Sequence, residues 1–238
     1  MEDPTITAVV VANDPSSSAV CLSAVANDHG LFASIDGVGT HDCDVLRRYD
    51  LDGFTMTHEY DGGLAEEGED QHVLLLNLTL APGGLLFAIG TRYSSNSEEV
   101  VCFDARTLEV RCRFGRGMFE QAFGMFTCGN ALFVGDGCSN AIKVFSLAGS
   151  FLRSFHSGCD SPRHLYHFDG RLYIMDFDSQ ATRIVVLTAE GERLLVWRPD
   201  STRRIRGLYG IYGRKLLIET ADASVGHRDV RLEALQGI

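Results

Sequence analysis

Leu132-Phe133-Val134-Gly135-Asp136 is one of five similar runs in this chain, and this repetition is the observation that indicates the fold class. Each run begins with leucine and continues with an aromatic residue, which the last run lacks, and then with further apolar residues. Each follows a turn that ends in glycine, asparagine or a basic residue. Short apolar runs bounded by turn residues are typical of strands buried on both faces. The other runs are Leu31-Phe32-Ala33, Leu86-Phe87-Ala88-Ile89, Leu172-Tyr173-Ile174 and Leu216-Leu217-Ile218.

Further strands surround each run. After the run at Leu132, residues 141–145 lead through a turn into residues 151–155, whose alternation predicts a half-exposed strand. Residues 123–127 form a strand pattern before the same run. The leucines that begin the runs are 55, 46, 40 and 44 residues apart, and no stretch shows a sustained helical period. The sequence therefore predicts an all-β chain of about four antiparallel strands per repeat.

Four-stranded units of this length around an axis are the blades of a β-propeller. We expect a single β-propeller domain over residues 1–238 with five four-stranded blades. The last repeat runs out of chain before a fourth strand, and residues 6–11 have no partner of their own, so this N-terminal strand is expected to close the ring. A sixth blade built from residues 38–80 is the alternative, because the first interval is too long for one loop.

The third and fourth repeats resemble the NHL family, whose units combine Pro-x-Gly-Ile, a Leu-Tyr-Val-Ala-Asp strand and Asn-x-Arg-Ile. The segments that carry the resemblance, clearest over residues 120–198, are Gly124-Met125, Leu132–Asp136, Asn140-Ala141-Ile142, Pro162, Leu172–Asp176 and Thr182-Arg183-Ile184. The sequence departs from the family at His164, where the family has glycine, and at Asn140-Ala141-Ile142, which lacks the arginine. Because the family has an aspartate in each unit, we expect Asp136 and Asp176 to be structural, as acceptors for N–H groups of the following turn.

The N-terminus and the cysteines predict the compartment. The chain starts with Met1-Glu2-Asp3-Pro4, and the apolar run at residues 8–12 is too short for a signal sequence or a membrane span. Seven cysteines without a C-x-x-C pair fit neither a zinc ribbon nor a secreted disulfide framework. We therefore expect a cytoplasmic chain with reduced cysteines and no membrane partner. Cys102 and Cys112 are the two that could face each other across a hairpin, as a redox-sensitive pair.

The sequence contains no pattern that identifies a catalytic or metal site. The candidate metal ligands are four histidines, but His164 and His167 are three apart in one expected strand and would point to opposite faces. The other two are His72 and His156. The catalytic residues are unknown, and no metal or cofactor is expected. A metal-dependent propeller hydrolase or lyase is the alternative that the resemblance leaves open.

Charge argues against nucleic acid as the main partner. The chain of 238 residues has a formal net charge of −11, and residues 1–100 hold seventeen acids and three arginines. Such a charge repels phosphates. A basic cluster near the end of the chain is nevertheless the reason to keep an RNA-binding propeller as a second alternative. The arginines proposed for it as binding residues are Arg203, Arg204 and Arg206.

The function expected from these observations is a non-catalytic platform that binds a protein or peptide on the loops at one end of the blades. Arg163, next to Pro162 where the fourth repeat begins, is the best single candidate for a contact residue. The resemblance implies an association with a ubiquitin-ligase assembly, whose catalytic module a separate partner would have to supply. We expect the chain to be a monomer.

Overall fold

The computed structural model contains only strands and turns among the residues that it describes, as the sequence predicted. Those residues are 20–28, 30–36, 45–60, 73–92, 97–177, 182–199, 203–212, 215–222 and 230–235. The chain divides into two compact units, which are described separately. The first comprises residues 1–122, 129–131 and 145–151, and the second comprises residues 123–128, 132–144 and 152–238.

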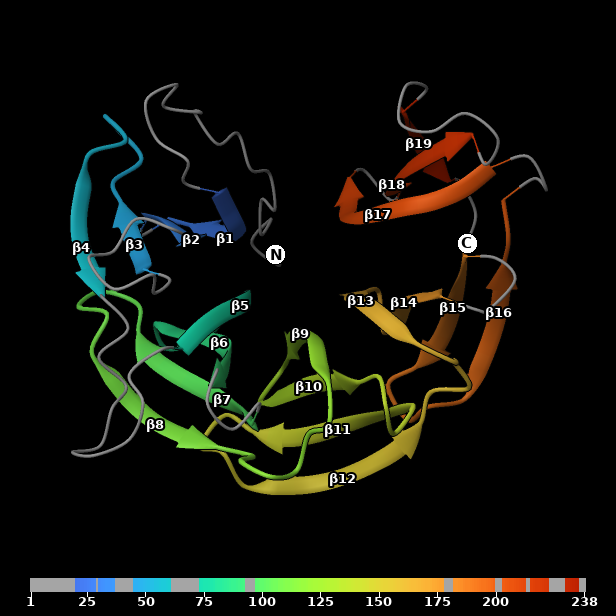
Figure 1. The fold of residues 1–238 in the computed structure, drawn as a ribbon, viewed down its shortest axis with the longest axis horizontal. Coiled ribbons are helices and arrows are strands. Elements are labelled where there is room, and N and C mark those ends of the chain that lie inside the picture. The colour runs from blue at the N-terminus through green and yellow to red at the C-terminus, as the bar shows by residue number, and fades with distance from the viewer. Residues whose placement is uncertain are drawn as a thin grey trace. The chain divides into compact units, whose positions relative to one another are not determined.

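Two antiparallel four-stranded sheets lie in the first unit, each with its strands in chain order (Figure 1). The first sheet is formed by β1 (Val20–Asn27), β2 (Gly30–Asp36), β3 (Val45–Tyr49) and β4 (Met56–Tyr60). The second is formed by β5 (Val73–Ala81), β6 (Leu85–Arg92), β7 (Ser97–Asp104) and β8 (Val110–Phe114).

Three further sheets follow along the chain. The third, whose residues are divided between the two units, is formed by β9 (Ala122–Cys128), β10 (Ala131–Asp136), β11 (Ala141–Ser146) and β12 (Phe151–His156). The fourth is formed by β13 (Pro162–Phe168), β14 (Arg171–Phe177), β15 (Thr182–Thr188) and β16 (Arg193–Trp197). The fifth is formed by β17 (Arg203–Tyr212), β18 (Lys215–Asp222) and β19 (Val230–Leu235).

Each of the five leucine runs is the second strand of its sheet, namely β2, β6, β10, β14 and β18. A second strand is hydrogen-bonded on both edges and packed on both faces, which explains its continuous apolar character. In β14 all five residues from Leu172 to Asp176 are buried. In β6, β10 and β14 the run therefore marks a strand with five consecutive buried residues.

The described part of residues 38–80 does not form a sixth blade. Residues 45–49 and 56–60 are β3 and β4 of the first sheet, and residues 73–81 are β5 of the second. The long first interval thus contains the outer half of one sheet and the beginning of the next. The N-terminal strand expected at residues 6–11 lies outside the described residues, so ring closure stays a prediction.

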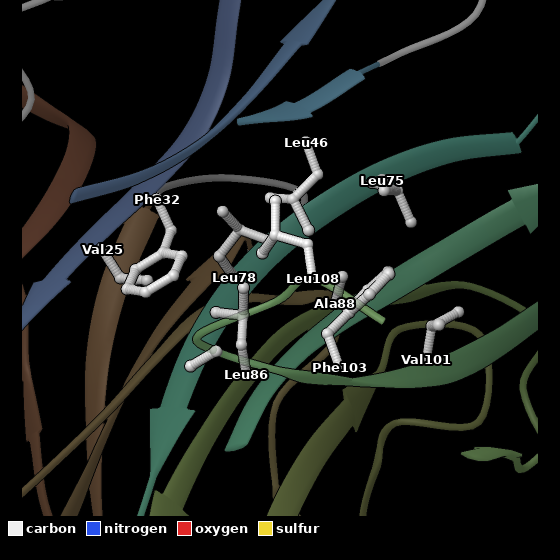
Figure 2. Packing of buried hydrophobic residues seen from close by; sticks show 11 residues of the cluster. Val25, Phe32, Leu46, Leu75, Leu78, Leu86, Ala88, Val101, Phe103 and Leu108 are labelled. Atoms are coloured by element: carbon white, nitrogen blue, oxygen red, sulfur yellow. The ribbon is translucent and has the colours of Figure 1, made fainter. Parts of the chain in front are cut away.

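The core of the first unit is an apolar cluster that draws on both of its sheets (Figure 2). Phe32 of β2, Leu86 of β6 and Phe103 of β7 are all 0% exposed. Burial of such a side chain contributes about 1.5–3 kcal/mol relative to leaving it in water. Figure 2 shows the labelled members: Val25, Phe32, Leu46, Leu75, Leu78, Leu86, Ala88, Val101, Phe103 and Leu108.

The outer strands are more exposed than their sequence pattern predicted. In β12, Phe151 and Leu152 are 47% and 56% exposed, so adjacent residues on opposite faces both reach solvent. In β16, Leu194 and Leu195 are likewise exposed. The alternation at residues 151–155 therefore does not produce one buried and one exposed face, because alternation determines which residues share a face but not whether another element covers that face.

Side chains at the start of a third strand bond to the first strand of the next sheet. The carboxylate of Glu98, in β7, accepts the backbone N–H of Ala122, where β9 begins. Thr182 begins β15, and its Oγ1 accepts the backbone N–H of Ile205 in β17 at 2.6 Å. Glu98 pairs with the last residue but one of β6, and Thr182 pairs with the last residue of β14. Each lies one residue before the residue that pairs with the fifth position of the leucine run, which is Gly90 in β6 and Asp176 in β14.

The boundary between the third and fourth sheets uses no such bond. Ile142 occupies the position that Thr182 holds forty residues later, and it is 0% exposed. The following strand begins with Pro162, which has no N–H to be accepted. An apolar side chain at this boundary therefore leaves no polar group unsatisfied.

Within the described residues, no helix has the length and hydrophobicity that crossing a membrane would require.

Candidate functional site

The end of the fourth sheet at which β13 begins and β14 ends is organised by Asp176. This carboxylate is 0% exposed. Its Oδ1 accepts the backbone N–H groups of Asp160 and Ser161 at 2.9 and 2.8 Å, and its Oδ2 accepts Nε of Arg183 at 2.7 Å. Asp176 therefore has a structural role, and the N–H groups that it accepts belong to the loop before β13. The turn after β14, which was expected to supply them, lies outside the described residues.

Asp136 holds the corresponding place in the third sheet. Its Oδ2 accepts the hydroxyl of Ser139 at 2.8 Å and the ammonium group of Lys143. Lys143 follows Asp136 by seven residues, as Arg183 follows Asp176. The NHL pattern has an arginine two residues after its asparagine, where this chain has Ile142. The cation is nevertheless present one position later, as Lys143.

Arg163 and Phe177 form an exposed pair above this buried network. Arg163 is the second residue of β13 and is exposed, while Phe177 is the last residue of β14 and is 40% exposed. The guanidinium carbon of Arg163 lies 5.6 Å from the centroid of the Phe177 ring, within the range of a cation–π interaction. Arg163 was expected from the sequence, but Phe177 was not, because a phenylalanine at the end of an apolar strand has no distinguishing signal.

The predicted basic site is described only in part. Arg204 is an exposed residue of β17, and its register partner is Ala221 of β18. Arg203 and Arg206 lie in the same strand, and their side chains are outside the description. The structure therefore places these three arginines in one strand.

The three candidate histidines that the structure describes have different surroundings. His164 is half-buried, and desolvation lowers its pKa, as does the neighbouring Arg163 guanidinium. The imidazole of His156 instead accepts the N–H of Gly158 through Nδ1 at 3.0 Å, and His167 contacts Cys128. Among the side chains that can be placed, no three of His, Cys, Asp or Glu could hold a metal ion together. His72 lies outside the described residues.

The cysteine pair predicted from the hairpin is present. Cys102 of β7 and Cys112 of β8 are direct register partners, and both are reduced. Burial, followed by the neighbouring Cys112, raises the pKa of Cys102 to about 12. Burial also raises the pKa of Cys159 to about 12. Both buried thiols are therefore protonated and unreactive at neutral pH.

Solved structures of known proteins share this arrangement of sheets. One is hydrazine synthase of Kuenenia stuttgartiensis, which matches 81% of this chain with 52% of its own, at 16% identity and a TM-score of 0.60. Another is virginiamycin B lyase from Staphylococcus aureus, which matches 79% of this chain with 59% of its own, at 14% identity and a TM-score of 0.55. A third is a chain of the nidogen–laminin complex, which matches 88% of this chain with 76% of its own, at 14% identity and a TM-score of 0.54.

The chain has a β-propeller fold. At these identities the similarity concerns the fold alone, and the chain spans about half the length of the hydrazine synthase chain. No protein-family model matches this sequence, and no curated protein sequence matches it either.

Proposed function

We propose that this chain is a non-catalytic, NHL-like β-propeller that binds a protein or peptide on the loops at one end of its blades. The observation that supports this proposal most is the exposed pair of Arg163 and Phe177 above the buried Asp176 network. Because the fold serves both enzymes and binding proteins, the proposal depends on this site and not on the neighbours' activities.

The pair offers a ligand two kinds of contact. The Arg163 guanidinium is a planar cation with several donors and is suited to carboxylates. The Phe177 ring gives an apolar face beside it, and arginine and aromatic residues dominate many interfaces. A peptide that carries an acidic residue next to an apolar one is therefore the partner that fits this surface.

The base of the surface is rigid before any ligand arrives. Asp176 precedes Phe177 directly and binds both Arg183 and the loop at Asp160 and Ser161. A surface held in place loses less conformational entropy on binding. This preorganisation favours recognition of a partner over a mobile catalytic loop.

The resemblance to NHL repeats is the basis for one narrower proposal, that the partner belongs to a ubiquitin-ligase assembly. The N-terminus and the cysteines are the basis for a second, that the chain acts in the cytoplasm. We also propose that it acts as a monomer. RNA binding through Arg203, Arg204 and Arg206 and metal-dependent hydrolysis or elimination are the competing functions.

Selection from a displayed peptide library tests the proposal. We expect enrichment of acidic peptides with an adjacent apolar residue, and binding about tenfold weaker or more in R163A and F177A, measured by fluorescence anisotropy. R171A is the matched control, because Arg171 is an exposed arginine at the other end of β14.

Three results would contradict the proposal. The first is a selected peptide that binds R163A and F177A as well as the unaltered chain, and the second is the absence of any selected peptide. The third is a stoichiometric metal whose removal abolishes a hydrolase or lyase activity. RNA affinity that falls steeply with salt and is lost in R204A would favour the basic strand as the site.

A further inference from the structure

We propose that Cys128 is a nucleophilic thiol, that His167 takes up its proton, and that the pair is a site of modification by hydrogen peroxide and other small electrophiles. Sγ of Cys128 lies 3.3 Å from Nε2 of His167. Cys128 ends β9, and His167 is the last residue but one of β13. Arg163 lies near the beginning of β13, so this site is separate from the proposed peptide surface.

A stack of rings fixes the direction of the imidazole. The His167 ring lies parallel to the Phe126 ring, with 5.8 Å between centroids and 6° between planes. Phe126 stacks in turn on Phe133 at 4.8 Å and 14°. Phe126 and Cys128 are two residues apart in β9 and therefore share one face of the strand. The strand thus presents to His167 both the ring that orients it and the thiol that it contacts.

This geometry is that of an activated thiol. A thiol is weakly nucleophilic until it loses its proton, and an adjacent imidazole that accepts the proton stabilises the thiolate. Cys128 and His167 are both half-buried, so a small reagent can reach the sulfur while bulk water is partly excluded. The turn after β9 is uncharged. Asp169 is the charged residue nearest His167 along the chain, and Arg163 and Arg171 each lie four residues away.

The other described thiols differ from Cys128 in burial, in pairing or in their place in the fold. Cys102 and Cys159 are buried and have their pKa raised to about 12, which suppresses thiolate formation. Cys112 is half-buried and is paired in register with Cys102. Cys138 lies exposed in a turn. Cys128, by contrast, combines partial burial with an imidazole nitrogen 3.3 Å from its sulfur.

The reaction with peroxide balances with the groups present. The Cys128 thiolate attacks one oxygen of hydrogen peroxide, an S–O bond forms and the O–O bond breaks. Sulfur is oxidised by two electrons to a sulfenic acid, and the peroxide is reduced to hydroxide and the sulfenic oxygen. The leaving hydroxide takes the proton from the His167 imidazolium to form water, which returns the imidazole to its neutral form.

The first test is the pH dependence of alkylation by iodoacetamide, measured for each cysteine-containing peptide by mass spectrometry. We expect the rate at Cys128 to reach half its maximum at or below about pH 7.5, against about pH 8.5 for an ordinary thiol. In H167Q the midpoint returns to about 8.5, because glutamine fills the position of Nε2 without accepting the proton at neutral pH. H156Q, which changes an exposed histidine of β12, is the control and leaves the midpoint unchanged.

The second test uses the sulfenic acid itself. After brief exposure to hydrogen peroxide, dimedone is expected to label the Cys128 peptide before the Cys138 peptide, and H167Q loses that preference. If H167Q does not fold, the absorbance of the thiolate near 240 nm, compared between the unaltered chain and C128S, gives the same midpoint. A midpoint at or above about 8.5 in the unaltered chain, no reaction at Cys128, or a midpoint that H167Q leaves unchanged would overturn the proposal.

Discussion

Thr182 accepts the backbone N–H of Ile205 on its side-chain oxygen at 2.6 Å, so a hydroxyl of the fourth sheet is hydrogen-bonded to the fifth sheet. Both residues are buried, at 5% and 1% exposure. A buried N–H without an acceptor costs about 1–3 kcal/mol, which makes this bond a sensitive point of the fold.

Replacing Thr182 with valine should lower the free energy of unfolding by about 1–3 kcal/mol, because valine has the same shape but no acceptor for Ile205. Urea denaturation followed by circular dichroism measures the change. T182S keeps the hydroxyl and serves as the control, with a smaller loss. A T182V variant that is as stable as T182S would show that the hydrogen bond does not matter.

Removing only one partner of the ion pair between Asp176 and Arg183 should destabilise the fold more than removing both partners. D176N removes the nearer and fully buried carboxylate from Arg183, whose side chain is 15% exposed, and leaves the exposed Asp160 carboxylate at 3.4 Å. We expect a loss of about 3 kcal/mol or more. The double variant D176N/R183M removes the cation too and should recover part of that loss. The same urea titration compares the two variants, and a double variant less stable than D176N would refute this account.

Gly124 and Gly135 should respond differently to alanine. A Cβ on Gly124 would lie 2.7 Å from the carbonyl oxygen of Arg163, which is backbone and cannot move aside easily. A Cβ on Gly135 would lie 2.7 Å from a methyl group of Leu165, which can rotate away. We expect G124A to lose about 1–3 kcal/mol and G135A clearly less. Melting temperatures of the two variants check the order, and equal losses would contradict it.

The titration of Asp104 should make the free energy of unfolding decrease at acid pH. A hydrogen bond from Arg111, with others from the backbone N–H groups of Arg106 and Thr107, lowers the pKa of Asp104 to about 2. In the unfolded chain this carboxyl titrates near about 3.9, so its contribution is complete above about pH 5 and is lost as the pH falls towards 2.

The melting temperature of D104N should therefore be below that of the unaltered chain at pH 6, and the gap should shrink by about half at pH 3. Differential scanning calorimetry at the two pH values measures the gap. In an R111Q background the gap at pH 6 should be smaller, because the largest cause of the shift is gone. A gap that is the same at pH 3 and pH 6 would show that Asp104 does not titrate in this way.

Much of the fold was predictable from local pattern. The leucine runs identify the second strand of every sheet, because enclosure on both faces requires continuous apolar sequence. Residues 38–80 were less predictable, since strands β3 and β4 are short and their polar residues resemble a loop. The exposure of Phe151 and Leu152 was missed for a related reason, because alternation shows which residues share a face but not whether anything covers that face.

The functional residues were predictable from the sequence only where a single residue stands out in its local context. Arg163 stands beside the conspicuous Pro162, whereas Phe177 becomes significant only when β13 and β14 lie side by side. Cys128 and His167 are 39 residues apart and match no motif. The available signal was the 40-residue spacing of the third and fourth repeats, which places both residues at the same end of successive first strands.

Because Pro162 has no N–H, the sheets of this chain cannot be duplicated or exchanged freely along the sequence. A copy of the third sheet inserted before the fifth would set Ile142 against the N–H of Ile205 and leave that donor buried with no acceptor. A copy of the fourth sheet inserted before Pro162 would bury the Thr182 hydroxyl opposite a ring that cannot donate. The repeats are therefore not interchangeable modules, and a graft or duplication has to carry each third strand together with the first strand that follows it.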